Sequence, residues 1–301
     1  MNTEVERIQK AIDIAKKNRP KYGQILDLFG KIMIKQAQSL DGIKVKPAVI
    51  KKDEARTKLR KGMPLLSRED FQIDTPSASR LFKELCKSLK SENQKLKDEI
   101  GKIESALEKG DLTLEEIFQS ILKGGGRISE LAETLLLDRD IMLMLATASV
   151  KPSLEAIASR VRDMVEGGSW SKHYCPVCGS SPAMSELRQL SSEGVEDTTT
   201  EGAERILYCS FCGTEWRAMR LGCAFCGNTD AESLRYFYTE DEKGYRIDVC
   251  EKCKKYIKTV DSREISHEIV FPMEDISTMH LDIIAEEEGY KREAWLMPHG
   301  I

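Results

Sequence analysis

Paired cysteines dominate this sequence. Eight of the nine cysteines in the 301-residue chain occur in Cys-x-x-Cys pairs, and all eight lie within residues 175–253. Two of the pairs, in YCSFCGTEWRAMRLGCAFCGN at 208–228, are separated by only ten residues. The four pairs are Cys175 and Cys178, Cys209 and Cys212, Cys223 and Cys226, and Cys250 and Cys253. A segment this dense in thiols binds metal, forms disulfides or carries redox chemistry, and each choice implies a different fold.

The cellular compartment of the protein determines whether paired cysteines are expected to form disulfides or to bind metal. The N-terminal stretch MNTEVERIQKAIDIAKKN is charged throughout and lacks the apolar core of an export signal. No membrane insertion is expected, because the most apolar stretch, residues 133–150, is interrupted by three charged residues and is typical of a buried helix. We therefore expect a cytoplasmic protein, in which thiols stay reduced and disulfides are disfavoured. Metal ligation becomes the leading use for the four pairs.

The spacing of the cysteines suits a four-sulfur metal site. A Cys-x-x-Cys turn directs two sulfurs at one ion, and two such turns face to face supply the tetrahedron used by structural zinc and rubredoxin-type iron. Gly179, Gly213 and Gly227 follow three of the turns, where the backbone needs a positive φ. The fourth turn departs from this pattern with Lys254.

An internal repeat suggests how the pairs combine. HYCPVCGSSPAMSEL (173–187) with RILYCSFCGTEWRAMR (205–220), and LGCAFCGNTDAESLRYFYTE (221–240) with YRIDVCEKCKKYIKTV (245–260), each predict the order turn, strand, strand, turn, strand. Sequential pairing is favoured, with Cys175, Cys178, Cys209 and Cys212 on one metal and Cys223, Cys226, Cys250 and Cys253 on the other; interleaved pairing stays open. Each unit of about forty residues is too small for a stable core, whereas structural zinc contributes about 10–16 kcal/mol. We predict that metal holds this region folded.

The first 168 residues predict a helical bundle. Leucines and isoleucines from Leu81 to Leu107 mark a long amphipathic helix, beside which Cys86 is expected to be an inert buried thiol. Residues 43–76, with three prolines, predict an extended surface excursion; Gly124–Gly126 predict a helix end and turn, and Pro152 separates two further helices. The fold class is α+β: a helical N-terminal domain (1–168), two rubredoxin-like or zinc-ribbon modules (169–221 and 222–301), and a C-terminal helix in the second.

Other chemistry fits the sequence less well. A thioredoxin-like dithiol needs one pair at a helix N-terminus, not four pairs flanked by strands. His173 lies two residues before Cys175, but eight cysteines leave it no ligand position. The remaining histidines have no ligand spacing, are expected at the surface, and form no nucleophilic pattern: His267, His280 and His299. The sequence pattern therefore offers no candidate catalytic residue.

Basic residues flank the cysteine turns, and their side chains have two possible roles. These residues are Arg217, Arg220, Lys252, Lys254 and Lys255. They offset the charge of four thiolates around a metal, or they contact phosphate as in nucleic-acid-binding zinc ribbons. Because the cysteine region also carries many acidic residues, nucleic-acid binding is the weaker reading.

The cysteine region resembles the formate dehydrogenase accessory proteins called FdhE. The stretch from Cys209 through Thr214, Glu215, Trp216 and Arg220 to Cys223 is the most specific part of the resemblance. GMPLL at 62–66 and the tail DISTMHLDIIAEEEGYKR also match; the matching tail residues, which suit that family's closing helix, are Thr278, Leu281, Asp282, Ala285, Gly289, Tyr290 and Arg292.

The resemblance implies a fold and a function. It implies a helical domain followed by two rubredoxin-like modules, with the eight paired cysteines binding two metal ions, iron being favoured and zinc allowed. It implies a non-enzymatic cytoplasmic protein that binds the catalytic subunit of a molybdenum- or tungsten-dependent formate dehydrogenase and supports its activation, and it allows a homodimer. The alternatives are a zinc-ribbon nucleic-acid-binding protein and a rubredoxin-like electron-transfer protein.

Overall fold

The computed structural model describes residues 3–46, 50–165, 170–189, 203–239 and 242–293. These residues form two compact units. Residues 3–46 and 66–160 make up a helical unit, and residues 50–65 join the described residues from 161 onward in a sheet unit. The division of the chain at residues 168 and 221 stays a prediction. The expected boundary at Gly167 and Gly168 lies outside the described residues, and so does His299.

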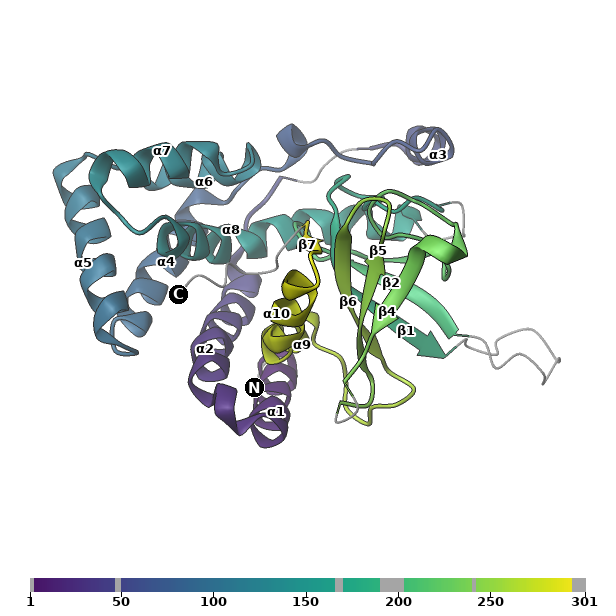
Figure 1. The fold of residues 1–301 in the computed structure, drawn as a ribbon. Helices are drawn as coiled ribbons and strands as arrows, with labels where there is room; N and C mark the ends of the chain where they lie inside the picture. The colour runs from purple at the N-terminus through teal and green to yellow at the C-terminus, as the bar shows by residue number, and fades with distance from the viewer. Residues whose placement is uncertain (1–2, 47–49, 166–169, 190–202, 240–241, 294–301) are drawn as a thin grey trace. The chain divides into compact units, whose positions relative to one another are not determined.

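Apolar residues at helical spacing build the helical unit (Figure 1). Its helices are α1 (Thr3–Asn18), α2 (Gly23–Ser39), α4 (Thr75–Leu89), α5 (Gln94–Lys109), α6 (Leu114–Leu122), α7 (Gly126–Leu135) and α8 (Arg139–Arg162), with short 3-10 turns at Pro20–Tyr22, Leu40–Gly42 and Arg68–Asp70. The expected turn at Gly124–Gly126 is confirmed, because α6 ends at Leu122 and both Gly124 and Gly125 have a positive φ.

Two helix predictions in this unit are wrong. The single helix expected along the leucine stripe is divided into α4 and α5, because the Asn93 side chain accepts a hydrogen bond from the Leu96 N–H and starts a new helix. The break expected at Pro152 is absent, and α8 continues through it. Proline costs a helix interior about 3 kcal/mol, but Val150 and Leu154 on either side are fully buried, so packing outweighs that cost.

Helix α8 contains most of the apolar segment expected to form one buried helix at 133–150, but α7 ends within that segment at Leu135, and Leu136 between the two helices is 84% exposed. Together with the short 3-10 turn Asp163–Val165, α8 is long and apolar enough to cross a membrane by length and composition. However, 78% of its most apolar 18-residue window is buried inside the protein, as in the core helix of a soluble fold.

Cys86 lies on α4 with its side chain 1% exposed, which confirms the expected burial. Burial raises the pKa of the Cys86 thiol to about 12, so almost none of it is thiolate at neutral pH. We therefore predict that Cys86 is not alkylated in the native protein and is fully alkylated in urea. Mass spectrometry after timed alkylation will show this, and modification of native Cys86 within minutes would contradict it.

The sheet unit contains one seven-stranded mixed sheet, so the α+β class is confirmed. The strands are β1 (Pro182–Gln189), β2 (Ala203–Cys209), β3 (Glu215–Ala218), β4 (Leu234–Phe237), β5 (Tyr245–Cys250), β6 (Lys255–Asp261) and β7 (Lys291–Arg292). Their order is β3-β2-β1-β6-β5-β4, with β7 beside β6. Each repeat supplies three strands in the predicted order, and the parallel pairing of β1 with β6 joins the repeats into one sheet.

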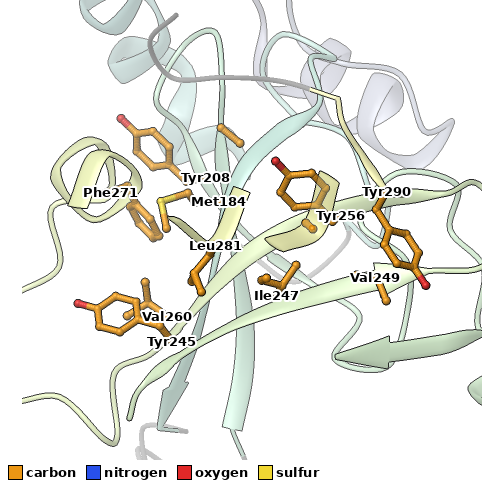
Figure 2. Close-up of a cluster of buried hydrophobic side chains, with 12 residues drawn as sticks. Met184, Tyr208, Tyr245, Ile247, Val249, Tyr256, Val260, Phe271, Leu281 and Tyr290 are labelled. Atoms are coloured by element: carbon orange, nitrogen blue, oxygen red, sulfur yellow. The ribbon is translucent and has the colours of Figure 1, made fainter. Parts of the chain in front are cut away.

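Two short helices complete the sheet unit in place of the single closing helix expected. They are α9 (Phe271–Ser277) and α10 (Met279–Glu287). Figure 2 shows their apolar side chains against one face of the sheet, where Phe271 stacks on Tyr208 with ring centroids 4.6 Å apart and Leu281 joins the same cluster. The closing segment therefore supplies part of the core that both repeats share.

The proline-containing segment between α2 and α4 also differs from expectation. The extended excursion predicted for residues 43–76 contains helix α3 (Lys52–Arg60). Ala55 and Leu59 are buried on one side of α3, and the remaining residues of this helix are mostly charged. Two apolar positions in nine residues gave too weak a periodicity to detect.

Candidate metal centres

The first four-cysteine cluster lies between the two turns of the first repeat. The sulfurs of Cys175, Cys178, Cys209 and Cys212 all lie within 4.8 Å of one another, and all four residues are buried. The Sγ atoms of Cys175 and Cys212 are 3.7 Å apart, and those of Cys178 and Cys209 are 3.4 Å apart. Residue 209 ends β2, so the sheet itself positions one side of the cluster.

The second cluster repeats this arrangement with greater exposure. Cys223, Cys226, Cys250 and Cys253 bring their sulfurs within the same 4.8 Å limit. The Sγ atoms of Cys223 and Cys253 are 3.6 Å apart, and those of Cys226 and Cys250 are 3.8 Å apart. Cys226 is exposed and Cys253 is half-buried, so two of the four sulfur ligands lie near the surface.

Both clusters fit one tetrahedrally bound ion each. A metal–sulfur bond of about 2.3 Å places the ligands of a tetrahedron about 3.8 Å apart, close to the sulfur–sulfur distances of 3.4 to 3.8 Å in the two clusters. The cysteines group in the order of the repeats and not in the interleaved alternative. The chain therefore has two tetracysteine sites, each suited to a single soft or borderline metal ion.

Burial explains why these sites need a cation. Burial raises the pKa of the Cys175 and Cys209 thiols, so these two thiols resist ionisation when no positive charge is present. A metal ion replaces the protons and compensates the buried negative charge. The same ion then becomes part of the folded structure, because the unfolded chain cannot assemble four sulfurs around it.

All four turns have the same backbone conformation. The residue after each second cysteine has a positive φ: 74° at Gly179, 67° at Gly213, 69° at Gly227 and 54° at Lys254. The Lys254 N–H donates to the Cys250 carbonyl at 2.8 Å, as the Gly179 N–H does to the Cys175 carbonyl at 2.9 Å. Lys254 thus follows the pattern despite its side chain, which pairs with Glu251 and lies over the Tyr290 ring.

Residues 62–65, part of the GMPLL motif, brace the first turn. The Leu65 N–H donates to the Pro176 carbonyl at 2.8 Å, and the Tyr174 hydroxyl donates to the Gly62 carbonyl at 2.6 Å. Pro64 approaches Gly179 so closely that a Cβ there would lie 2.9 Å from its Cγ. These contacts give the GMPLL motif a structural role. The sequence identified the motif only through the family resemblance, because no local pattern predicts that residues 62–65 lie next to Cys175.

The contact between Pro64 and Gly179 gives a testable prediction. Gly179→Ala adds left-handed strain, which costs about 1–2 kcal/mol, and a clash with Pro64, which costs about 1–3 kcal/mol more. Gly110→Ala is the matched control, because Gly110 has a φ of 78° and nothing within 4 Å of the added Cβ. Urea unfolding should show the larger loss for Gly179→Ala; equal losses would refute the bracing role.

Most of the basic side chains near the turns are already paired. Arg217 pairs with Glu204 at 2.6 Å, Lys252 with Asp230 at 3.6 Å, Lys255 with Glu293 at 2.5 Å, and Lys254 with Glu251. Among the residues that the structure describes, Arg220 alone of the five predicted positions forms no ion pair. This pairing leaves little free charge for phosphate, so the nucleic-acid reading loses its main support.

His173, His267 and His280, the histidines among the described residues, lie outside both sulfur clusters. His173 packs against the second site, where a Cβ on Gly227 would lie 3.1 Å from its Nδ1. The prediction that His267 and His280 lie at the surface is wrong, because both side chains are partly buried. Their Nε2 atoms lie 3.0 Å from Glu274 and 2.6 Å from Glu242, respectively.

A buried charge network fastens the tail to the sheet. Asp275 accepts from Lys258 at 2.8 Å and from Arg292 at 2.5 Å, and Asp282 pairs with the same two cations at 2.7 and 2.9 Å. The Tyr256 hydroxyl also donates to Asp282 at 2.9 Å. Sequence reasoning singled out Asp282 and Arg292 in the tail but missed Lys258 and Asp275. A lysine inside the apolar strand KYIKTVD was the available signal, since buried lysines need partners.

The fold and the sulfur geometry define an α+β protein with two tetracysteine metal-binding sites in one sheet. The model of the family described as "FdhE, C-terminal domain" matches residues 221–297. The "Protein FdhE homolog" of Aquifex aeolicus (strain VF5) is 28% identical over 280 residues, which cover 93% of this chain and 89% of that protein. "Protein FdhE" of Escherichia coli (strain K12) is 33% identical over 124 residues, 41% of this chain and 36% of that protein.

A solved structure shares the fold. The crystal structure of the FdhE protein from Pseudomonas aeruginosa superposes with a TM-score of 0.67, covering 100% of this chain and 98% of that one at 19% sequence identity. At that identity the likeness concerns the fold alone. The sequence matches show that this chain is similar to FdhE proteins over most of its length and that residues 221–297 match the family's C-terminal domain.

Proposed function

We propose that this chain is a non-catalytic cytoplasmic accessory protein that binds the catalytic subunit of a molybdenum- or tungsten-dependent formate dehydrogenase and supports its activation. The observation that carries the proposal is the similarity to FdhE proteins, which includes a relative aligned over 93% of the chain. The eight cysteines that the family resemblance assigns as ligands lie in two tetracysteine sites. We further propose that these sites hold two iron ions, with zinc as the alternative.

The chemistry of the sites supports a binding role. Four sulfur ligands saturate a tetrahedral ion, so neither site offers the open coordination position that a catalytic metal uses to activate water or substrate. In this proposal the buried first site stabilises the sheet, and the exposed sulfurs of the second site face a partner. A homodimer is compatible with this role.

Affinity capture under anaerobic conditions tests the proposal. Full-length tagged protein should recover the formate dehydrogenase catalytic subunit, and deletion of its gene should abolish formate oxidation until the intact gene is restored. Complementation with a Cys175→Ser variant should fail, because that variant loses the first site. Normal formate oxidation in the deletion strain, together with no recovered subunit, would reject the proposal.

Electron transfer is a second candidate, favoured by the exposure of Cys226 at the second site. Iron in four-thiolate coordination cycles between two oxidation states, and an exposed sulfur eases electron exchange. Visible absorption that bleaches with dithionite and returns with an oxidant would support this role. A colourless, zinc-filled protein from iron-replete cells would eliminate it without affecting the accessory role.

A further inference from the structure

Exposed apolar side chains gather beside the second four-cysteine site. Leu221 is 74% exposed, Tyr236 57% and Tyr238 66%, and we call these three residues the edge patch. Tyr236 and Tyr238 stack with ring centroids 6.1 Å apart, and Leu221 and Tyr236 line the same cavity. Large apolar side chains that cluster at the surface of a soluble protein mark interaction sites more often than isolated ones do.

The cavity at the edge patch is basic. It has a volume of about 200 Å³ and is bounded by Leu221, Tyr236 and two ligands of the second site, Cys223 and Cys250. Its charged lining consists of five basic residues and one acidic residue: Arg205, Arg220, Arg235, Arg246, Lys255 and Asp248. Asp248 is occupied by Arg205 and Arg246.

Two of these cations are not held in a close ion pair. Among the described residues, neither Arg220 nor Arg235 forms an ion pair, and both are exposed. The guanidinium of Arg246 lies 5.1 Å from the centroid of the Tyr236 ring, which extends the positive charge over the edge patch. An acidic ligand is therefore electrostatically complementary to this cavity.

Strand β4 adds an open hydrogen-bonding edge beside the cavity. It ends the strand order and pairs only with β5 among the described strands (Figure 1). The Glu251 N–H donates to the Ser233 carbonyl, and the register continues from Leu234 opposite Cys250 to Phe237 opposite Ile247. Antiparallel pairing alternates, so the backbone N–H and C=O of Tyr236 point away from β5. An unpaired edge of this kind accepts an additional strand.

We infer that the β4 edge and its basic cavity bind an extended acidic segment of a partner protein, with an apolar side chain of that segment in the cavity. The inference rests on the proposed function, which makes the formate dehydrogenase catalytic subunit the partner. The segment pairs with β4 through the Tyr236 backbone, and its carboxylates face Arg220 and Arg246. Docking at this edge places the partner beside Cys226, the exposed cysteine of the second site.

Binding of purified catalytic subunit to full-length protein tests the inference. The double variant Arg220→Glu/Leu221→Asp should weaken binding by at least about tenfold, as expected for residues at the centre of an interface. Its affinity should also depend less on salt than that of the parent, because an attractive charge has been reversed. Ile283→Asp on α10 is the matched control: Ile283 is 57% exposed in the same unit, and its variant should bind within about twofold of the parent.

The outcomes separate the inference from the proposed function. If the parent protein itself does not bind the subunit, both fail. If the parent binds and the double variant binds equally well while retaining the parent's metal content, the docking surface alone is wrong. A photo-crosslinker at Tyr238 should attach to an acid-rich segment of the subunit. Attachment to a basic segment, or to a second copy of this chain with a matching change in oligomeric state, would also overturn the inference.

Discussion

Cys175→Ser is expected to remove one metal ion per chain and to unfold the strands of the first repeat, which surround the first site. A structural zinc ion contributes about 10–16 kcal/mol to a small domain, which matches or exceeds the total stability of about 5–15 kcal/mol of a typical protein. Cys175 is fully buried, and its turn contacts the segment that carries Leu65. Metal analysis should give one ion per chain, and amide exchange should show loss of protection in β1, β2 and β3.

The matched variant is Cys226→Ser at the second site. Cys226 is exposed, so a water molecule can replace its sulfur and the loss of packing is small. We expect this variant to keep its fold, to retain at least one ion, and to release the second ion to a chelator faster than the parent does. Equal loss of structure in both variants would show that exposure does not distinguish the two sites.

Asp275→Ala is expected to destabilise the sheet unit by about 3–5 kcal/mol, the cost of breaking a buried ion pair. The Asp275 side chain is 0% exposed, and its removal leaves Lys258 and Arg292, which are 1% and 2% exposed, with only Asp282 to compensate two buried cations. Urea unfolding followed by tryptophan fluorescence reports on this unit, because Trp170 and Trp216 both belong to it.

Lys252→Ala serves as the control for this effect. Lys252 pairs with Asp230 at 3.6 Å, but the two side chains are 57% and 48% exposed. Surface pairs of this kind contribute less than about 1 kcal/mol. A loss for Asp275→Ala that is no larger than the loss for Lys252→Ala would mean that the buried network does not hold the tail in place.

The cysteine region was predictable because metal ligation imposes strict local spacing. Two residues between the cysteines and a glycine after three of the pairs predicted the turns, and the internal repeat predicted the order of the strands. The internal repeat favoured sequential grouping of the cysteine pairs on the two metals. The ten residues between the second and third pairs left an interleaved grouping open, and the arrangement of the strands decides between the two. The positive φ of Lys254 was not predictable from propensity, because lysine rarely adopts it.

Long-range contacts account for what the sequence did not predict. Pro64 and Gly179 lie 115 positions apart, and no local pattern links them. The pairing of β1 with β6 depends on the complete sheet, so two repeats that look separate in the sequence share one layer. Pro152 lies inside α8 because burial of its neighbours outweighs the tendency of proline to break a helix. In each case tertiary packing overrode or extended the local signal.

X-ray absorption at the metal edge, combined with metal quantification on full-length protein purified without oxygen, tests the central claim most directly. Sulfur shells at about 2.3 Å, four ligands per ion, and two ions per chain are the expected result. A chain that is fully folded with no bound ion, or ions coordinated mainly by nitrogen or oxygen, would contradict the assignment of both tetracysteine sites.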